Sequence, residues 1–484
     1  MNLGKMLEES CAIFPDRIAV IHRENKLTFS ALHRAVNSLA NRLERSGIGR
    51  EDKVTIMLPN IPEFVISYFA IQKVGGVAVT INTSSTSFEL KYLLDNSDSK
   101  LLITTANLQP RFDAIQASLS SRCGVLSTNG LGMPSSFTEA IQSGPFEHVA
   151  PDIRPDDPAV MIYTAGLTGK PLGAVLTHRN LLTQSELLRG VFSGTPDDRS
   201  FCIIPLFHSF GAAANMLCPI RIGAGMVMLD QFLMDDIFRT IEIEKVTYIC
   251  SVPRLFLGML FHPGGNSFNL SSLRFCITGG SAIPPHCIAD FQKRFNVGLF
   301  EGYGLTEAAP ICSVTRMDLP QKPGSIGTGI PGVELKVFGK DGRELPRGET
   351  GELVVRGPNV MKGYYKEEKA TASVIRDGWL HTGDLALMDE DGYVFLKGLM
   401  KRMIITSGFN VYPREVEIVL DMHPAVRKSR VIGKPDLMRG EIVKALIVPA
   451  TDSGVDEKSV LKHCRTYLSS YKVPREIEIV KSLD

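Results

Sequence analysis

The stretch Ala159-Val-Met-Ile-Tyr163-Thr-Ala-Gly-Leu-Thr-Gly-Lys-Pro-Leu-Gly173 joins an apolar run to a loop rich in glycine and threonine. The apolar run predicts a buried strand. The loop holds three glycines and two threonines, and such a loop can turn N–H groups and hydroxyls toward phosphate oxygens. It is not a P-loop, because G-x-x-x-x-G-K-[ST] is absent. A tight turn between two strands is the alternative interpretation.

Strands and helices alternate on both sides of this loop. Apolar residues at helical spacing predict helices over residues 30–44, 64–74 and 254–260. Short β-rich runs predict strands over residues 52–59, 77–82, 101–105, 246–251 and 273–278. This alternation is typical of an α/β fold with a largely parallel sheet.

The composition and the hydrophobic pattern change in the last third of the chain. From about residue 324, glycines, prolines and short β-rich runs dominate, and Asp-Gly pairs at 341–342 and 391–392 indicate hairpins. We expect a β-rich, barrel-like subdomain over residues 324–398. Beyond it, a strand near 403–406 and helices near 413–422 and 459–468 predict a compact α+β module. The expected architecture is a large N-terminal domain, residues 1–400, and a small mobile C-terminal domain, residues 401–484.

Composition excludes several classes of protein. The 484 residues carry 53 basic and 52 acidic side chains, which argues against a dedicated nucleic-acid binder. Nine scattered cysteines without a C-x-x-C pair argue against a disulfide framework or zinc cluster and favour a reducing compartment. Acidic residues near the start do not fit a signal peptide, and no apolar run is long enough to span a membrane. We therefore expect a cytoplasmic protein; the oligomeric state is not readable.

Two further segments could contact a nucleotide. In Glu301-Gly-Tyr-Gly-Leu-Thr-Glu307, an aromatic ring between glycines could lie flat against a base, and Thr306 and Glu307 offer oxygen ligands suited to Mg²⁺ near phosphates. In Gly378-Trp-Leu-His-Thr-Gly-Asp384, the aspartate could accept both hydroxyls of a ribose. Taken singly, the first could be a loop aromatic that covers the core, and the second a turn.

In this order, the three segments resemble the adenylate-forming (AMP-binding) superfamily, and most closely its fatty and aryl acyl-CoA ligases. The resemblance runs from Thr28-Phe-Ser to Tyr471-Lys-Val-Pro-Arg475, nearly the whole chain. Further matching motifs are Pro205-Leu-Phe-His-Ser-Phe-Gly211, Gly279-Gly-Ser-Ala-Ile-Pro284, Gly351-Glu-Leu-Val-Val-Arg-Gly-Pro358, Gly363-Tyr-Tyr365 and Gly408-Phe-Asn-Val-Tyr-Pro-Arg-Glu-Val-Glu417.

The resemblance implies a ligase that uses ATP, Mg²⁺ and coenzyme A. A carboxylic acid, which we expect to be a fatty acid, is first converted to acyl-AMP and then transferred to CoA. His208, Thr306 and Glu307 are the implied catalytic residues, with Glu307 holding the metal. The implied nucleotide-binding residues are Thr164, Gly166, Thr168, Gly169, Lys170, Gly173, Gly280, Ser281, Gly302, Tyr303, Gly304 and Asp384. Tyr303 would stack on adenine and Asp384 would bind the ribose.

The resemblance also implies which residues form the acyl pocket and which take part in the thiol step. The acyl pocket would be formed by His208, Phe210, Gly211, Gly279 and Gly280, with the small residues at 211–214 leaving room for an acyl chain. Lys401 and Arg402 fall at the implied hinge of the small domain, and Gly408 on its surface that faces the site for the thiol step. The implied partners are small molecules only.

Several positions depart from the family pattern. The family loop reads Y-T-S-G-T-T-G-x-P-K-G, whereas Ala165, Leu167 and Leu172 stand here in place of two hydroxyls and a lysine. Each lost hydrogen bond to a charged partner is worth about 1.5–3 kcal/mol. Lys170, which lies two residues before Leu172, offers a cation at a displaced position. The hinge reads Gly398-Leu-Met-Lys-Arg402 instead of G-R-x-K-D, and the given chain ends at Asp484 without the family's terminal G-K motif, so we expect a shortened lid domain.

These departures leave alternatives open. The first is a complete AMP-forming acyl-CoA ligase, favoured by the retained His208, Thr306, Glu307 and Asp384. The second is a degenerate relative that binds a nucleotide or acyl ligand without adenylation activity. The third is an enzyme that keeps only the thioester-forming half-reaction.

Overall fold

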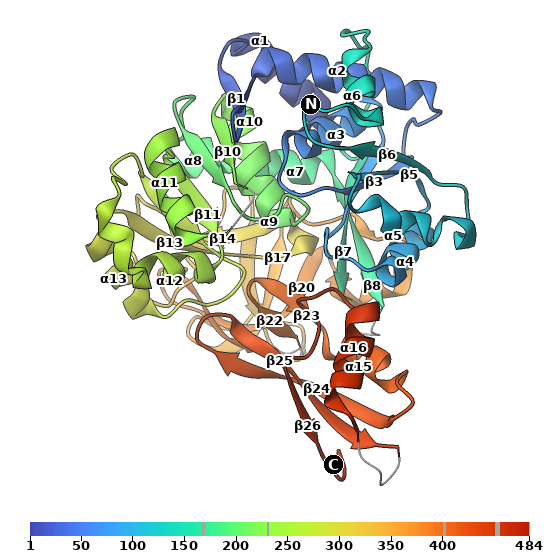
Figure 1. Ribbon diagram of the computed structural model, residues 1–484. Helices are drawn as coiled ribbons and strands as arrows, with labels where there is room; N and C mark the ends of the chain where they lie inside the picture. Colours follow the sequence, from blue (N-terminus) through green and yellow to red (C-terminus); the bar gives the residue numbers. More distant parts are fainter. Residues whose placement is uncertain (166–169, 230–231, 400–402, 451–454, 484) are drawn as a thin grey trace.

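The computed structural model describes residues 1–165, 170–229, 232–399, 403–450 and 455–483. Its fold is the predicted one, with a large N-terminal domain of α/β layers and a small α+β C-terminal domain (Figure 1). In the figure the small domain, coloured orange to red, lies at the end of the molecule opposite α1 and α2. In the part of the chain that the structure describes, no helix is long and apolar enough to cross a membrane.

The first large sheet has nine strands, and its central strands are parallel. In spatial order they are β15 (Thr328–Gly329), β14 (Ile311–Val314), β13 (Gly298–Gly304), β12 (Phe275–Thr278), β11 (Tyr248–Ser251), β9 (Arg199–Cys202), β10 (Gly225–Met228), β1 (Ile18–His22) and β2 (Asn25–Thr28). The parallel register between β12 and β13 brings Thr278 beside Glu301. The chain therefore leaves β11, β12 and β13 at the same sheet edge, where ligands bind in parallel α/β sheets.

The second large sheet has seven strands and carries the glycine-rich loop. Its order is β18 (Gly363–Tyr364), β8 (Pro171–Thr177), β7 (Pro158–Ala165), β4 (Val77–Thr80), β3 (Lys53–Met57), β5 (Ser99–Thr105) and β6 (Gly124–Thr128). The core strands are parallel, but β7 and β8 are antiparallel and pair Thr164 with Leu172. The strands on either side of the glycine-rich loop therefore form an antiparallel pair, while residues 166–169 lie outside the described residues.

Helices cover both sheets and bury an apolar core that both share. Those of the large domain are α1 (Leu3–Ile13), α2 (Phe29–Arg45), α3 (Pro62–Lys73), α4 (Ser87–Ser97), α5 (Gln109–Asp113), α6 (Ser136–Gln142), α7 (His178–Ser185), α8 (Leu187–Phe192), α9 (Ser209–Ala212), α10 (Cys218–Ile222), α11 (Met234–Glu244), α12 (Pro253–Phe261), α13 (Pro285–Phe295) and α14 (Glu368–Val374). Short 3₁₀ or π turns lie at Gln116–Ser118, Ala213–Leu217, Pro263–Ser267 and Thr306–Ala308.

Two smaller sheets complete the fold, and both are antiparallel except where β26 pairs in parallel with β25. The β-rich region forms β16 (Glu334–Phe338), β17 (Thr350–Arg356), β20 (Trp379–Met388) and β19 (Ile375–Arg376), with β21 (Val394–Leu399) beside β20. The small domain, called the lid below, forms β23 (Phe409–Val411), β22 (Ile404–Thr406), β25 (Gly440–Pro449) and β24 (Val426–Asp436), with β26 (Glu476–Ile479) beside β25. Its helices α15 (Pro413–Asp421) and α16 (Glu457–Tyr467) pack on this sheet and give the lid a core of its own.

Candidate active site

A cavity of about 870 Å³ lies at the edge where β11, β12 and β13 end. Thr164 reaches it from the seven-stranded sheet, Asp384 from the antiparallel sheet of the β-rich region, and Gly408 from the lid. Segments from four different sheets therefore converge on one enclosed space. A cavity of this size matches pockets that bury most of a small ligand.

Most of the predicted site residues line this cavity. They are Thr164, His208, Phe210, Gly279, Gly280, Ser281, Gly302, Tyr303, Gly304, Thr306, Glu307, Asp384 and Gly408. Gly166, Thr168, Gly169, Lys401 and Arg402 lie outside the described residues. Of the positions that depart from the family, Leu167 and Arg402 also lie outside the described residues, whereas Leu172 is described and pairs with Thr164 in the β7–β8 hairpin.

Two predicted phosphate-loop residues do not line the cavity. Gly173 lies within the β7–β8 hairpin, where an added Cβ would stand 2.7 Å from the sulfur of Met161. Lys170 is exposed at the near end of β8. Neither residue is among those that line the cavity, so the predicted contact of Gly173 with phosphate is not supported by its position.

The predicted role of Gly211 in the acyl pocket is not supported by its position. Gly211 does not line the cavity, because it faces the chain that precedes it: an added Cβ would stand 2.3 Å from the backbone oxygen of Pro205. The glycine allows α9 to pack on the strand-to-helix connection, and it does not make room for a ligand. Of the small residues at 211–214, only Ala214 lines the cavity.

Two hydroxyl groups of the seven-stranded sheet converge on Glu307. The Oε1 atom of Glu307 accepts a hydrogen bond from the Tyr364 hydroxyl at 2.7 Å and one from Thr164 Oγ1 at 3.3 Å. Thr306, the preceding residue, lies with its Oγ1 3.4 Å from Ser209 Oγ. The turn Thr306–Ala308 thus places a carboxylate and a hydroxyl beside the hydroxyls of Tyr364, Thr164 and Ser209 at one end of the cavity. Such a set of oxygens suits a phosphate group with a hard cation.

Tyr303 and Asp384 are directly joined. The Tyr303 hydroxyl donates to Asp384 Oδ2, although the two residues are 81 positions apart in the chain. Burial, and then the nearby Asp384 charge, raise the pKa of Tyr303 well above its usual value. The phenol is therefore a fixed hydrogen-bond donor at neutral pH. This bond places the predicted adenine-binding ring beside the predicted ribose-binding carboxylate.

His208 is held as a neutral ring. Its Nδ1 accepts a hydrogen bond from the backbone N–H of Phe210 at 3.3 Å, which caps α9. Burial lowers the pKa of His208 to about 4. In a neutral imidazole whose Nδ1 accepts, Nε2 carries the proton. His208 can therefore donate a hydrogen bond to an oxygen anion without bringing a positive charge.

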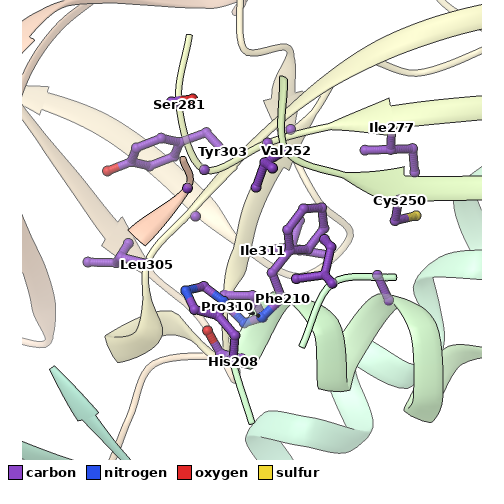
Figure 2. Close-up of a pocket in the computed structure, with 18 of the residues that line it drawn as sticks. His208, Phe210, Cys250, Val252, Ile277, Ser281, Tyr303, Leu305, Pro310 and Ile311 are labelled. Carbon is purple, nitrogen blue, oxygen red and sulfur yellow. Dashed lines mark hydrogen bonds between the residues drawn. The ribbon is translucent and has the colours of Figure 1, made fainter. Parts of the chain in front are cut away.

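The other end of the cavity is apolar. Figure 2 shows Phe210, Ile277 and Ile311 around the same space, with His208 beside Pro310 at its edge. Deeper lining residues are Leu187, Leu188, Phe192, Ala214, Cys218, Tyr248, Cys250 and Phe275. Burial raises the pKa of Cys218 to about 12, so this thiol stays uncharged. The cavity is thus amphipathic, with oxygens near Glu307 and hydrocarbon beyond His208.

Glu301 adds a second carboxyl group to the cavity. It lies on β13 two residues before Tyr303, and burial raises its pKa to about 7, partly offset by a hydrogen bond from the Ile283 backbone. A carboxyl group with this pKa changes charge close to neutral pH.

We expect the contribution of Glu301 to stability to fall as the pH rises from about 4.5 to 7. In that interval the folded state keeps the Glu301 proton, whereas the unfolded chain loses it near 4.5, so the loss reaches up to about 3 kcal/mol. Glu301→Gln cannot lose a proton, so its stability should rise relative to that of the wild type over this interval. Urea unfolding midpoints at pH 5, 6, 7 and 8 measure this difference, with the exposed Glu334→Gln as the control. Parallel profiles for all three proteins would contradict it.

Three polar residues of the cavity have positions or contacts that the sequence did not indicate. Tyr364 belongs to a recognised motif, but its bond to Glu307 depends on β18 pairing with β8. Glu301 begins another motif and gave no sign of burial. Arg254 lines the cavity where α12 faces the lid, with its guanidinium 3.4 Å from Ser407 Oγ. A lone arginine in a helix carries no local signal of such a contact.

Comparisons with known proteins agree with this geometry. Residues 7–365 match the family model described as AMP-binding enzyme, and residues 415–484 match that of the AMP-binding enzyme C-terminal domain. The chain belongs to the AMP-binding enzyme family. The predicted resemblance to the adenylate-forming superfamily is confirmed.

The similar proteins of the AMP-binding family are ligases. The chain is 34% identical to a long-chain-fatty-acid–CoA ligase of Bacillus subtilis, covering 100% of this chain and 91% of that protein. It is 36% identical to a feruloyl-CoA synthase of Amycolatopsis, with 100% and 96% covered. The solved structure of the amide bond synthetase McbA from Marinactinospora thermotolerans aligns with a TM-score of 0.92, at 28% identity over 100% of this chain and 96% of that one.

These likenesses confirm the prediction of an enzyme of the acid–thiol ligase class. They do not support the alternative of a degenerate relative without adenylation activity. The substrates in the relatives' names differ, from a long-chain fatty acid to an aryl acid, and so leave the acid of this AMP-binding enzyme to be inferred from its cavity.

Proposed function

We propose that this protein is an AMP-forming acyl-CoA ligase that activates a fatty acid. The acid's carboxylate attacks the α-phosphorus of ATP, and the bond to the pyrophosphate oxygen breaks, giving acyl-AMP and pyrophosphate. The sulfur of CoA then attacks the acyl carbon, and AMP leaves while the thiol proton is released. The observation that carries this proposal is the single cavity whose oxygen-rich end continues into an apolar end.

The oxygen-rich end fits a nucleotide. Tyr303, with Gly302 and Gly304 beside it, would lie against adenine, and Asp384 would accept the ribose hydroxyls. Thr164 and Thr306 would donate to phosphate oxygens, next to the wall made by Gly280 and Ser281. Gly166, Thr168, Gly169 and Lys170 are proposed to complete the phosphate loop.

The same end fits Mg²⁺ brought in with ATP. Within the described ranges no cluster of three or more His, Cys, Asp or Glu side chains could form a protein cage for a metal. Mg²⁺ usually binds one or two carboxylates together with substrate phosphates and waters. Glu307, with the hydroxyls around it, matches that pattern. The bound ion would neutralise charge on the phosphates.

His208 lies between the two ends and would orient the acid. The N–H of its neutral ring can donate to the substrate carboxylate and leave the second oxygen free to attack. Because the ring carries no charge, it does not lower the nucleophilicity of the carboxylate as a cation would. This role needs His208 neutral, which its burial provides.

The apolar end favours an aliphatic acid over a charged or strongly polar one. Its lining side chains beyond His208 are hydrocarbon, aromatic or uncharged thiol groups. Each CH₂ group buried there contributes about 0.8 kcal/mol. A chain of medium or greater length therefore gains most from this space.

We expect Ala214→Phe to shorten the range of acids used. Ala214 lines the deep end, and its backbone oxygen accepts from the Tyr248 hydroxyl at 3.2 Å. A phenyl group there fills the space of several CH₂ groups, so kcat/KM for dodecanoate should fall at least about 30-fold, since each lost CH₂ costs about 0.8 kcal/mol. Hexanoate, measured with the same enzyme, is the control and should change little. An equal loss for both acids would contradict the assignment of the deep end.

The thiol would arrive between the two domains. A second cavity of about 400 Å³ lies there, lined by Arg254 of the large domain and Ser407, Gly408 and Arg439 of the lid. Burial, and then the neighbouring charges of Arg439 and Arg475, lower the pKa of Arg254. Cations held this close attract a phosphate-bearing ligand such as CoA.

Gly408 allows the close contact between the domains at this opening. Its φ is +84°, and an added Cβ would stand 2.5 Å from Val252 Cγ1. Glycine is thus required at position 408 both by the positive φ and by the close contact between the lid and Val252. Lys401 and Arg402, seven and six residues earlier, remain the proposed hinge.

We expect Arg254→Ala to raise KM for CoA about 10-fold or more, because a lost charge-assisted contact costs about 1.5–3 kcal/mol. KM for ATP should stay within about twofold, since Arg254 bonds to Ser407 and not to the residues around Glu307. Steady-state kinetics with each substrate varied in turn make the test. Arg239→Ala, on the neighbouring α11, is the matched control. A rise in KM for ATP alone would contradict the CoA route.

Two further predictions remain proposals. We place the domain boundary near residue 400, with residues 1–400 forming the AMP-binding domain and 401–484 the lid. We also propose a cytoplasmic location, because nine free, buried cysteines are typical of a reducing compartment.

The decisive experiment supplies the purified protein with ATP, Mg²⁺ and a panel of carboxylic acids, and measures pyrophosphate and acyl-AMP. Release that depends on a fatty acid, followed by acyl-CoA when CoA is added, supports the proposal. No release with any acid contradicts adenylation. Synthetic acyl-AMP plus CoA then tests the thioester-only alternative, which requires acyl-CoA to form.

A further inference from the structure

A buried lysine joins the lid to the large domain, outside the cavity. The Lys472 ammonium lies 2.8 Å from Glu89 Oε1 of the large domain and also contacts Glu415 Oε1 of the lid. The three side chains are only 10–11% exposed. Each domain therefore contributes one carboxylate to a single shielded cation.

Glu89 has a second role at the start of α4. Its Oε2 accepts from the backbone N–H of Thr86 at 2.9 Å, which completes a capping box, and also from the Ser469 hydroxyl of the lid at 2.7 Å. The Thr86 hydroxyl in turn donates to the backbone oxygen of Tyr467 at 3.1 Å. The first turn of α4 is thus a preformed docking point for the lid segment 467–472.

The charges at this contact persist at neutral pH. Burial alone would lower the pKa of Lys472, but Tyr471 and the two carboxylates raise it well above its usual value. Burial alone would raise the pKa of Glu89, but Lys472 keeps it below its usual value. Removing one partner of a buried charge pair leaves an uncompensated buried charge, so separation of the domains here is unfavourable unless water replaces both partners.

The same lid segment supports the part of the lid that lines the cavity. The ring of Tyr471 stacks on Phe409, with centroids 4.7 Å apart, and Phe409 lines the cavity. Glu415, the second partner of Lys472, lies in the first turn of α15, three residues after cavity-lining Tyr412. Tyr471 therefore supports residues 407–412 directly, through its contact with Phe409. Lys472 supports them indirectly, through Glu415 at the start of α15.

The predicted ATP-binding groups do not depend on this contact. Thr164, Tyr364 and Glu307 bond to one another, and Tyr303 bonds to Asp384, all within the large domain. The second cavity, in contrast, takes walls from both domains at Arg254 and at residues 407–408. A shift of the lid would remove one wall of the proposed thiol route and leave the nucleotide site in place.

We propose that Lys472 and Glu89 form an interdomain latch that positions residues 407–412 for transfer of the acyl group to the thiol, and that adenylation does not require it. Lys472 is a positioning residue, since it contacts neither cavity nor proposed substrate. The inference rests on the proposed function.

The cleanest test is Glu89→Gln. The amide keeps the size of the side chain and an oxygen that can cap α4, and the Lys472–Glu415 pair within the lid stays intact. Asp95→Asn is the matched control, because it removes the same charge from the same helix, where the Asp95 carboxylate pairs with Lys91 and, among the described residues, forms no ion pair with Lys472. Lys472→Arg should preserve much of the wild-type behaviour.

The expected result is a split between the half-reactions. With Glu89→Gln, kcat/KM for acyl-CoA formation from synthetic acyl-AMP should fall about 10-fold or more. Single-turnover pyrophosphate release without CoA should change less than twofold. The double variant Glu89→Gln with Lys472→Met should lose no more kcat/KM for acyl-CoA formation than Lys472→Met alone. Equal loss in both half-reactions, additive losses in the double variant, or no loss at all would overturn the latch.

A measurement without catalysis separates the latch from the proposed function. Hydrogen–deuterium exchange of the full-length protein should rise in residues 407–412 and 467–472 of Glu89→Gln, with no change in 303–307. Unchanged exchange in both lid segments would overturn the latch even if the enzyme is active. An increase in exchange would support it even if no acid is found to be activated, in which case the proposed function alone fails.

Discussion

Glu307→Gln should lower the rate of acid-dependent pyrophosphate release by about 10²–10³-fold, the range seen when one electrostatic stabiliser of a transition state is removed. The substitution keeps the size of the side chain but removes the negative charge on which Tyr364 and Thr164 converge. It also removes the carboxylate proposed to hold Mg²⁺, so phosphate charge would be poorly neutralised. Single-turnover assays at saturating ATP and Mg²⁺ measure the rate.

The control for this prediction is Glu334→Gln, which makes the same chemical change at an exposed residue of β16. It should leave the rate within about 1.5-fold, because exposed ion pairs contribute little. Tyr364→Phe removes one donor to Glu307 and should have a smaller effect than Glu307→Gln. A Glu307→Gln enzyme with a rate within about threefold of wild type would exclude Glu307 from the chemistry.

Asp384→Ala should weaken ATP binding by about 10²-fold or more. The substitution removes the charged acceptor of the Tyr303 hydroxyl and leaves that buried phenol without this partner. It also removes the proposed acceptor of two ribose hydroxyls, and hydrogen bonds to a charged group contribute about 1.5–3 kcal/mol each. Isothermal titration with ATP and with AMP should show similar losses, because both ligands carry the ribose.

Adenine without ribose separates the two parts of this effect. If Asp384 binds ribose, affinity for free adenine should fall much less than affinity for AMP. Asp318→Ala, which removes an exposed carboxylate paired with Arg316, is the control and should bind ATP as the wild type does. Equal losses for adenine and AMP would mean that Asp384 acts only by holding the ring of Tyr303.

The motifs that are continuous in the chain were predictable, because their neighbours are set by covalent connection. The segment 301–307 places Tyr303, Thr306 and Glu307 within seven residues, and all three line the cavity. Helix spacing likewise gave residues 30–44 and 413–422, which form α2 and α15 with boundaries shifted by one residue or so. Local periodicity decides which face of such an element is buried.

Predictions failed where a residue's role depends on what packs against it. Gly211 is small enough to leave room in a pocket, but the backbone of Pro205 occupies the space next to it. Glu89 received no role from the sequence, because its contact with Lys472 spans 383 positions of the chain. No pattern in either segment could reveal the other as its neighbour.

The order and chemistry of the motifs thus fixed the family, the two-domain α/β plan and the identity of most groups in the cavity. Packing settled the rest: which hydroxyls reach Glu307, that His208 is neutral, that an apolar space lies beyond it, and that Lys472 joins the domains. Side-chain chemistry and periodicity are local properties of a chain. Distances and burial arise only when four separate sheets meet, and these govern hydrogen bonding and charge.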